Sequence, residues 1–253
     1  MKMTRMAVVG LVLAACLATL PIRPEQTAAA ASSKEAMAAV DKMIGAMGGR
    51  KVLESIKDTT ISGTVEIVPY GITSPITVYQ KEPDKLRADI TIAQADMTII
   101  QAFDGRKGWM TDPQTGSTVE MPDFMAKDLA RQASGNQFLL FPKKYGVTYA
   151  LKPKATLEGK DYIVIEQTLA DGHKTTFYLD PETYLPYKTQ TRSLDINGAE
   201  VDSETYATDY REVGGTMVPY AARTVQNGSD AQRMTVASVT YNTNPDDAFF
   251  TLK

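Results

Sequence analysis

The hydrophobic residues of the chain change their spacing at Thr59, from a helical repeat to a strand-like one. Within Ser33–Gly49 they recur three and four positions apart, which predicts an amphipathic helix that ends at Gly48 and Gly49. The shorter segment Arg50–Asp58 predicts a second helix. From Thr59 onward apolar and polar residues alternate, and this alternation is typical of strands with one buried face.

Strand-like segments then follow one another through short connections. The first four are Thr60–Val68, Ser74–Glu82, Lys85–Ala93 and Asp96–Phe103. The next one, Lys107–Asp112, follows an Asp-Gly turn and carries the only tryptophan of the chain, Trp109. Short connections predict that neighbouring strands pair antiparallel.

One helical segment interrupts the strands. Met121–Gly135 begins with Pro122-Asp123 and has apolar residues at helical spacing, so it predicts a helix inserted in the sheet. Strand-like segments resume at Thr148 and continue to Asn242. We therefore expect one mainly β domain over residues 33–253, with about ten or eleven antiparallel strands that curl or close.

The N-terminus has the pattern of an export signal. Lys2 and Arg5 precede the apolar segment Met6–Leu20, which is short for a membrane span. We interpret residues 1–32 as a signal peptide and spacer, so the expected location is the periplasm.

Two cleavage sites remain open. Leu13–Cys16 resembles a lipobox, in which case Cys16 is lipidated and anchors the protein to a membrane. The small residues of Thr27–Ser33 suit ordinary signal peptidase and soluble release instead.

Composition excludes several classes of function. The formal net charge of −3 is not that of a nucleic-acid-binding protein. Cys16 is the only cysteine, so no intrachain disulfide can form. His173 is the only histidine and follows Asp171-Gly172, where we expect a solvent-exposed turn. Hydrolysis by a histidine-activated serine or cysteine is therefore not expected, and a zinc site lacks ligands.

Carboxylates are abundant but show no catalytic arrangement. Asp202 and Glu204 share a strand face with Tyr206, as on an ordinary solvated surface, although a catalytic pair is the alternative reading. We expect no catalytic residue, no metal ligand and no cofactor, and we do not expect an enzyme.

Apolar residues occupy one face of several predicted strands. In Lys85–Ala93 and Asp96–Phe103, for example, apolar residues occupy most of the alternate positions. A sheet of this size needs its concave side filled, either by the helical segments or by a ligand. The pattern alone favours complete filling by the helices.

Four segments follow, in order, the sequence patterns of a known protein family. Lys81–Ile90 has the pattern K-x-P-x-x-L-R, and Ile99–Gly116 continues with an apolar strand and a D-G-R turn before the tryptophan strand. Leu157–Gln190 has a later G-K-x-Y…D-x-x-T-x-L-P pattern, and Asn244–Leu252 resembles the family's ending. Together these segments resemble the outer-membrane lipoprotein carrier (LolA-like) and lipoprotein-sorting family over most of the chain from Ser33.

The resemblance implies a fold and a ligand. Its members have an unclosed antiparallel β-barrel with helices that cap a hydrophobic cavity, in which they carry lipoprotein acyl chains or other lipids across the periplasm. The helical insertion at 121–135 is closer to the broad lipoprotein-sorting group than to the well-studied carrier, so the cargo is left open. The residues that the resemblance implies for the cavity are Trp109, Phe103, Ile99, Arg87, Ile90, Phe124, Met125 and Leu129.

The same resemblance implies partners. Lipid or lipoprotein acyl chains are the expected ligand, and an envelope protein is expected for loading or release. Contact with a membrane is expected only if Cys16 is acylated. The alternative is an envelope sensor or scaffold of the same fold that binds a protein partner.

Overall fold

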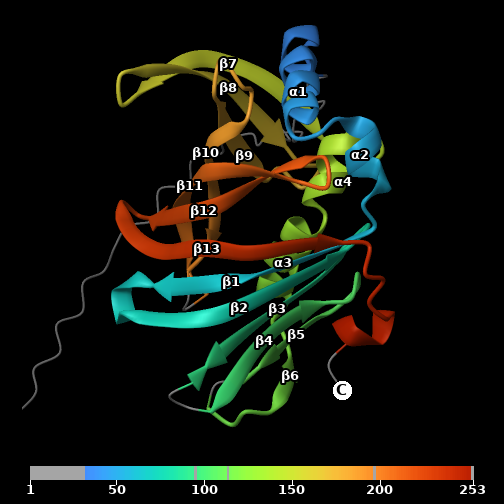
Figure 1. Cartoon of the computed structure of the whole chain (residues 1–253), viewed down its shortest axis with the longest axis vertical. Coiled ribbons are helices and arrows are strands. Elements are labelled where there is room, and N and C mark those ends of the chain that lie inside the picture. The colour runs from blue at the N-terminus through green and yellow to red at the C-terminus, as the bar shows by residue number, and fades with distance from the viewer. Residues whose placement is uncertain (1–31, 94–95, 113, 196–197, 252–253) are drawn as a thin grey trace, which may run out of the picture. The chain divides into compact units, whose positions relative to one another are not determined.

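A thirteen-stranded antiparallel sheet dominates the computed structural model, which describes residues 32–93, 96–112, 114–195 and 198–251 (Figure 1). Cys16 and the apolar segment Met6–Leu20 lie outside these residues. Within the described ranges, no helix combines the length and the apolar character needed to cross a membrane.

The helices and strands alternate little along the chain. The helices are α1 (Lys34–Ala46), α2 (Arg50–Ser55), α3 (Asp123–Ala133) and α4 (Gly135–Leu140), with short 3-10 helices η1 (Val68–Tyr70) and η3 (Asp247–Phe250). The strands are β1 (Asp58–Ile67), β2 (Ile72–Lys81), β3 (Lys85–Ile92), β4 (Met97–Phe103), β5 (Gly108–Thr111), β6 (Thr118–Glu120), β7 (Thr148–Leu157), β8 (Lys160–Thr168), β9 (Lys174–Leu179), β10 (Pro186–Leu194), β11 (Glu200–Val213), β12 (Thr216–Gln226) and β13 (Ser229–Tyr241).

The strand order explains where the helices lie. The order is β6-β5-β4-β3-β2-β1-β13-β12-β11-β10-β9-β8-β7, so two meanders meet where β1 pairs with β13. The strands at the two edges, β6 and β7, are consecutive in the chain, and the connection between them contains α3 and α4. Because this connection must span the width of the sheet, it covers one face of it (Figure 1).

The sheet has more strands than the ten or eleven expected from the sequence, and it is mainly β and unclosed as expected. The additional pairing includes β6, whose three residues Thr118–Glu120 pair with β5. A segment of this length shows no alternation that sequence reading can detect.

Local sequence accounts for α1. The hydroxyl of Ser33 accepts a hydrogen bond from the backbone N–H of Ala36 at 3.1 Å and so caps the helix. The residues that α1 buries recur at helical spacing and are Ala36, Ala39, Val40, Met43 and Ile44. The helix ends before Gly48, which has a φ of 124° that favours glycine. By contrast, α2 buries no residue and spans less than the predicted Arg50–Asp58.

Two hydrophobic clusters lie between helices and sheet. The larger one joins α1 and α4 to β7, β8 and β9; its buried members include Met43, Leu139, Leu140, Tyr149, Ile165 and Leu179. The smaller one joins α3 to β3 and β4; its members are Leu86, Phe103, Met121, Leu129 and Ala133. Both clusters use the same face of the sheet, which we call the helix face.

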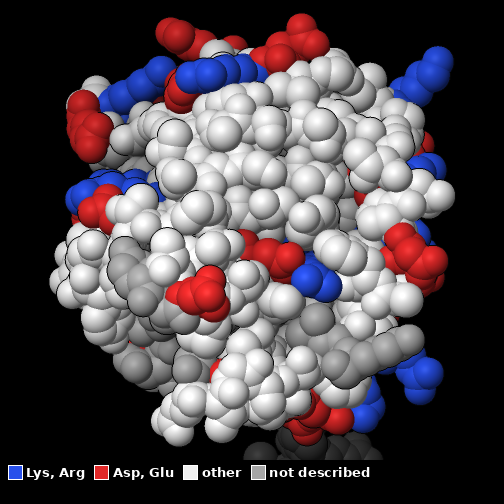
Figure 2. All heavy atoms as spheres, turned by 60° about the horizontal axis from the view of Figure 1, so that its bottom comes forward, with Lys and Arg blue, Asp and Glu red and all other residues white. Residues whose placement is uncertain are grey.

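The register relates the two faces to individual residues. Leu86 pairs with Phe103 and packs on α3, so it lies on the helix face. Arg87 follows Leu86 in β3 and pairs with Ala102, which precedes Phe103 in β4. Because successive residues of a strand point to opposite faces, Arg87 and Ala102 lie on the other face, which we call the outer face. Figure 2 shows a side of the molecule on which few charged residues lie in the middle and most lie toward the rim.

Candidate functional site

Part of the helix face is closed by α3. This helix packs against β3, β4 and β5 and also contacts β10. Phe103 is 8% exposed and Leu129 is 6% exposed, and Met125 packs against the same cluster. These three residues, expected to line a cavity, are therefore packed against one another in the core. Here the helix fills the concave side, as the hydrophobic pattern alone favoured.

The helix face continues beyond this cluster as an apolar surface. Ile90 pairs with Ile76 on one side and with Ile99 on the other, and all three are partly exposed. Two residues further along the same strands, Ile92 of β3 pairs with Met97 of β4 and extends this surface. We call the following partly exposed residues of β1 to β4 the apolar strip: Ile61, Ile76, Val78, Ile90, Ile92, Met97 and Ile99.

Arg87 and Trp109 are not on this face, which corrects the expectation that they share one surface with Phe103. Trp109 pairs with Ala102, so both Trp109 and Arg87 belong to the outer face. The Arg87 guanidinium binds the Asp89 carboxylate at 2.7 and 3.1 Å, donates to the carbonyl of Phe249 at 2.9 Å, and lies 4.2 Å from the centre of its ring. It thereby fastens η3 to the outer face.

Phe124 is the most exposed of the predicted residues. It lies at the start of α3 and is 53% exposed. Two of its ring atoms are 3.4 and 3.5 Å from the position that a Cβ would take at Gly198, in the turn before β11. The first turn of α3 therefore reaches the β10–β11 connection.

Ion pairs hold the other end of α3. The Asp171 carboxylate, in the β8–β9 turn, accepts hydrogen bonds from Arg131 Nε at 3.2 Å and Nη2 at 2.8 Å, and it lies 3.2 Å from Lys127 Nζ. Burial would raise the pKa of Asp171, but the hydrogen bonds from Arg131, from the backbone N–H of His173 and from Lys127 outweigh it and lower that pKa well below its ordinary value. The α3 helix thus links both halves of the sheet.

His173 also differs from its expected setting. It lies in the predicted turn but is partly buried, and its Nε2 is 2.9 Å from the hydroxyl of Thr191. Burial and the nearby Arg131 lower its pKa. A position in a turn did not place this side chain in solvent, because the turn packs against α3 and β10.

The candidate carboxylate pair consists of two separately neutralised groups on the outer face. Glu204 accepts hydrogen bonds from Lys188 at 2.6 Å and from Tyr206 at 2.8 Å, whereas Asp202 lies 3.6 Å from Arg192. Burial would raise the pKa of Glu204, but these hydrogen bonds lower it overall. In the part of the chain that the structure describes, no cluster of acidic, histidine or cysteine side chains could hold a metal ion.

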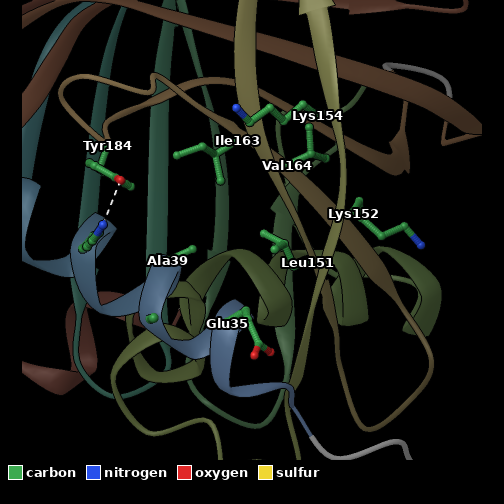
Figure 3. A pocket seen from close by; sticks show the side chains of 10 residues that line it. Glu35, Ala39, Leu151, Lys152, Lys154, Ile163, Val164 and Tyr184 are labelled. Carbon is green, nitrogen blue, oxygen red and sulfur yellow. Dashed lines mark hydrogen bonds between the residues drawn. The ribbon is translucent and has the colours of Figure 1, made fainter.

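A hollow of about 390 Å³ lies at the other end of the helix face, between α1 and strands β7 and β8 (Figure 3). We did not expect this hollow from the sequence. Its lining residues are Glu35, Ala38, Ala39, Lys42, Leu151, Lys152, Lys154, Ile163, Val164 and Tyr184. The exposed Leu151, in a strand segment otherwise rich in lysine, is the signal that the sequence contained.

Solved structures share this architecture. A structure described as an outer membrane lipoprotein-sorting protein domain from Vibrio parahaemolyticus matches with a TM-score of 0.56 and 13% identity, over 84% of this chain and 97% of the other. A LolA superfamily protein from Nitrosomonas europaea matches with a TM-score of 0.57 and 14% identity, over 86% and 97%. A DUF1329 family protein from Desulfovibrio piger matches with a TM-score of 0.58 and 11% identity, over 86% and 98%.

Sequence comparison adds no further relative: no protein-family model and no curated protein matches the chain. Identities of 11% to 14% relate folds rather than activities. The unclosed sheet, the helices on one of its faces and these three matches agree with the family resemblance of the sequence motifs. The chain has the fold of the outer-membrane lipoprotein carrier (LolA) superfamily.

Proposed function

We propose that this protein is a non-enzymatic binding protein of the cell envelope that holds an acyl chain of a lipid or lipoprotein against the apolar strip. The observation that carries the proposal is the partly exposed row Ile76–Ile90–Ile99 on the helix face of an unclosed sheet. Contiguous apolar surface of this kind marks a site for an apolar partner. Carrier proteins of the same fold support this reading.

The energetics suit a hydrocarbon ligand. Covering an acyl chain stabilises a complex by about 0.8 kcal/mol per methylene, without any directional polar contact. The strip supplies side chains of that kind, because all seven of its members are aliphatic or methionine. Methionine at position 97 adds an adaptable surface for chains of different shape.

Loading and release are the roles we assign to a partner protein of the envelope. The α3 helix borders the strip; Arg131 joins it to Asp171 in the β8–β9 turn, and Phe124 in its first turn lies near Gly198. Something that competes for these contacts would expose more of the helix face. We place the protein in the periplasm after removal of the signal segment, with membrane contact only if Cys16 is acylated.

The test is the lipid content of the purified periplasmic form, measured by native mass spectrometry and by extraction. We expect co-purifying lipid, and we expect Ile90→Asn to weaken binding of an added neutral lipid about tenfold, because it places a polar amide in the strip. Thr91→Asn is the matched control, since Thr91 is the next residue of β3 and faces outward.

A protein that carries no lipid and ignores added lipid would overturn the proposal. Recovery of one stoichiometric protein partner, unaffected by Ile90→Asn, would favour the sensor or scaffold role in its place.

A further inference from the structure

The hollow between α1 and β7–β8 combines an apolar floor with an excess of positive charge. Ala38, Ala39, Ile163 and Val164 line it, and Leu151 is 46% exposed there. A volume of about 390 Å³ lies at the low end of the range for ligand pockets, so it suits a single chain rather than a lipid with several chains.

The charged lining residues do not neutralise one another. Three are lysines, Lys42, Lys152 and Lys154, and one is an acid, Glu35. The Lys42 ammonium binds the neutral hydroxyl of Tyr184 at 2.9 Å and lies 4.7 Å from the centre of the Tyr184 ring. This contact orients the ammonium group and leaves its charge uncompensated.

Lys154 provides a second uncompensated cation on the facing wall. In Figure 3 its side chain extends from β7 toward the side where Ile163 and Tyr184 lie, whereas Lys152 points the other way. Lys152 lies 3.6 Å from a carboxylate oxygen of Glu166. None of the carboxylates in the described ranges pairs with Lys154.

The hollow is also accessible. It lies beside β7, which is the last strand of the sheet. A ligand therefore enters from the sheet edge, without displacing α3, and covers Leu151 as it binds.

We propose that this hollow is a binding site for a single-chain anionic amphiphile, such as a fatty acid, whose acidic group lies between Lys42 and Lys154 and whose chain covers Leu151 and Ile163. Charge-assisted hydrogen bonds to a carboxylate are stronger than neutral ones and would fix the orientation of the ligand. The site lies at β7 and β8, away from the apolar strip of β1 to β4, so the inference goes beyond the proposed function.

The test compares three probes that have nearly the same straight alkyl chain and differ in the head group: dodecanoate, dodecanol and dodecyltrimethylammonium. Titration calorimetry gives each affinity, below the micelle concentrations of the two charged probes and below the solubility limit of dodecanol. We expect dodecanoate to bind tightest, and we expect Lys154→Glu to weaken dodecanoate about tenfold or more while changing dodecanol little. Lys51→Glu, on the exposed surface of α2, is the control with the same change of net charge.

The outcomes separate this inference from the proposed function. Equal affinities for the three probes, or equal losses for Lys154→Glu and Lys51→Glu, would overturn the anionic site while lipid binding at the strip stands. Loss of dodecanoate binding in Ile90→Asn but not in Lys154→Glu would also overturn it, because the probe would then lie on the strip. Unchanged thermal unfolding of Lys154→Glu would confirm that its effect is local.

Discussion

The carboxylate of Asp171 is the point at which α3 is joined to the second half of the sheet, and removing its charge tests that role. Asp171→Asn keeps the shape of the side chain but removes the charge that Arg131 and Lys127 share. The exposed fractions of the Arg131 and Asp171 side chains are 24% and 30%, so solvent screens the pair only in part.

The magnitude follows from these contacts. A hydrogen bond to a charged group contributes about 1.5–3 kcal/mol, and an exposed pair contributes at most about 1 kcal/mol. The partly buried Arg131–Asp171 pair lies between these limits, and Lys127, which is 58% exposed, adds little. We expect Asp171→Asn to lower the free energy of unfolding by about 1–2 kcal/mol at pH 7.

The pH dependence has a definite sign. The pKa of Asp171 is lower in the folded protein than in the unfolded chain. The stabilisation is therefore complete above the unfolded pKa of about 3.9 and is lost as pH falls through the folded pKa. The difference between wild type and Asp171→Asn should shrink below about pH 4, as the carboxylate of the wild type becomes protonated.

Urea unfolding at a series of pH values measures this difference, and hydrogen exchange reports whether α3 amides open more often in the variant. Glu182→Gln, in the exposed β9–β10 turn, is the control with the same charge change. Equal stability of wild type and Asp171→Asn, or a difference that stays constant down to pH 2, would refute the role assigned to Asp171.

Three further predictions concern the packing of the molecule, each checked by urea or thermal unfolding. Leu129→Ala should lower the free energy of unfolding by about 2–5 kcal/mol, because Leu129 is only 6% exposed. Ile99→Ala, in the partly exposed strip, should lower it by about 1 kcal/mol. Equal losses in the two variants would contradict the distinction between core and strip. Glu204→Gln should lower the free energy of unfolding by about 2–3 kcal/mol, because it leaves the Lys188 ammonium, whose side chain is 8% exposed, without its counter-charge. Lys188→Met removes the buried charge itself and should lower the free energy of unfolding less. The reverse order would disprove this account. Gly48→Ala should cost more than about 1 kcal/mol because φ is 124° and the added Cβ would overlap a carbonyl oxygen of the β11–β12 turn; a variant as stable as wild type would show that this turn yields.

Two of the residues predicted for the cavity, Arg87 and Trp109, do not lie on the helix face. Leu86, Ala88, Ile90 and Ile92 alternate along β3, and this alternation alone places Arg87 on the opposite face. The signal that excludes Arg87 from the helix face was therefore present in the sequence. The family resemblance, which names positions without their orientation, pointed the other way.

Trp109 could not be assigned in this manner. Its face depends on the register of β4 and β5, in which Phe103 pairs with Gly108 and Trp109 pairs with Ala102. A register shifted by one residue would place Trp109 beside Phe103 on the helix face, because side chains alternate with a period of two. The hydrophobic pattern of a four-residue strand does not distinguish the two registers.

Local periodicity, turns and capping predict the class of the fold: α1, the alternating strands, their antiparallel pairing and the helix between β6 and β7. Which apolar residues of the helix face are covered by a helix, and which stay partly exposed, depends on the packing of the whole chain. Phe103 and Ile99 lie on the same face of β4, yet only Phe103 is covered by α3. For the hollow, the sequence shows only an apolar Leu151 among lysines; the hollow itself forms when α1 packs on β7 and β8 and so brings Lys42 and Lys154 to one site. Periodicity records the face of each residue, whereas coverage of that face depends on the path of a distant segment.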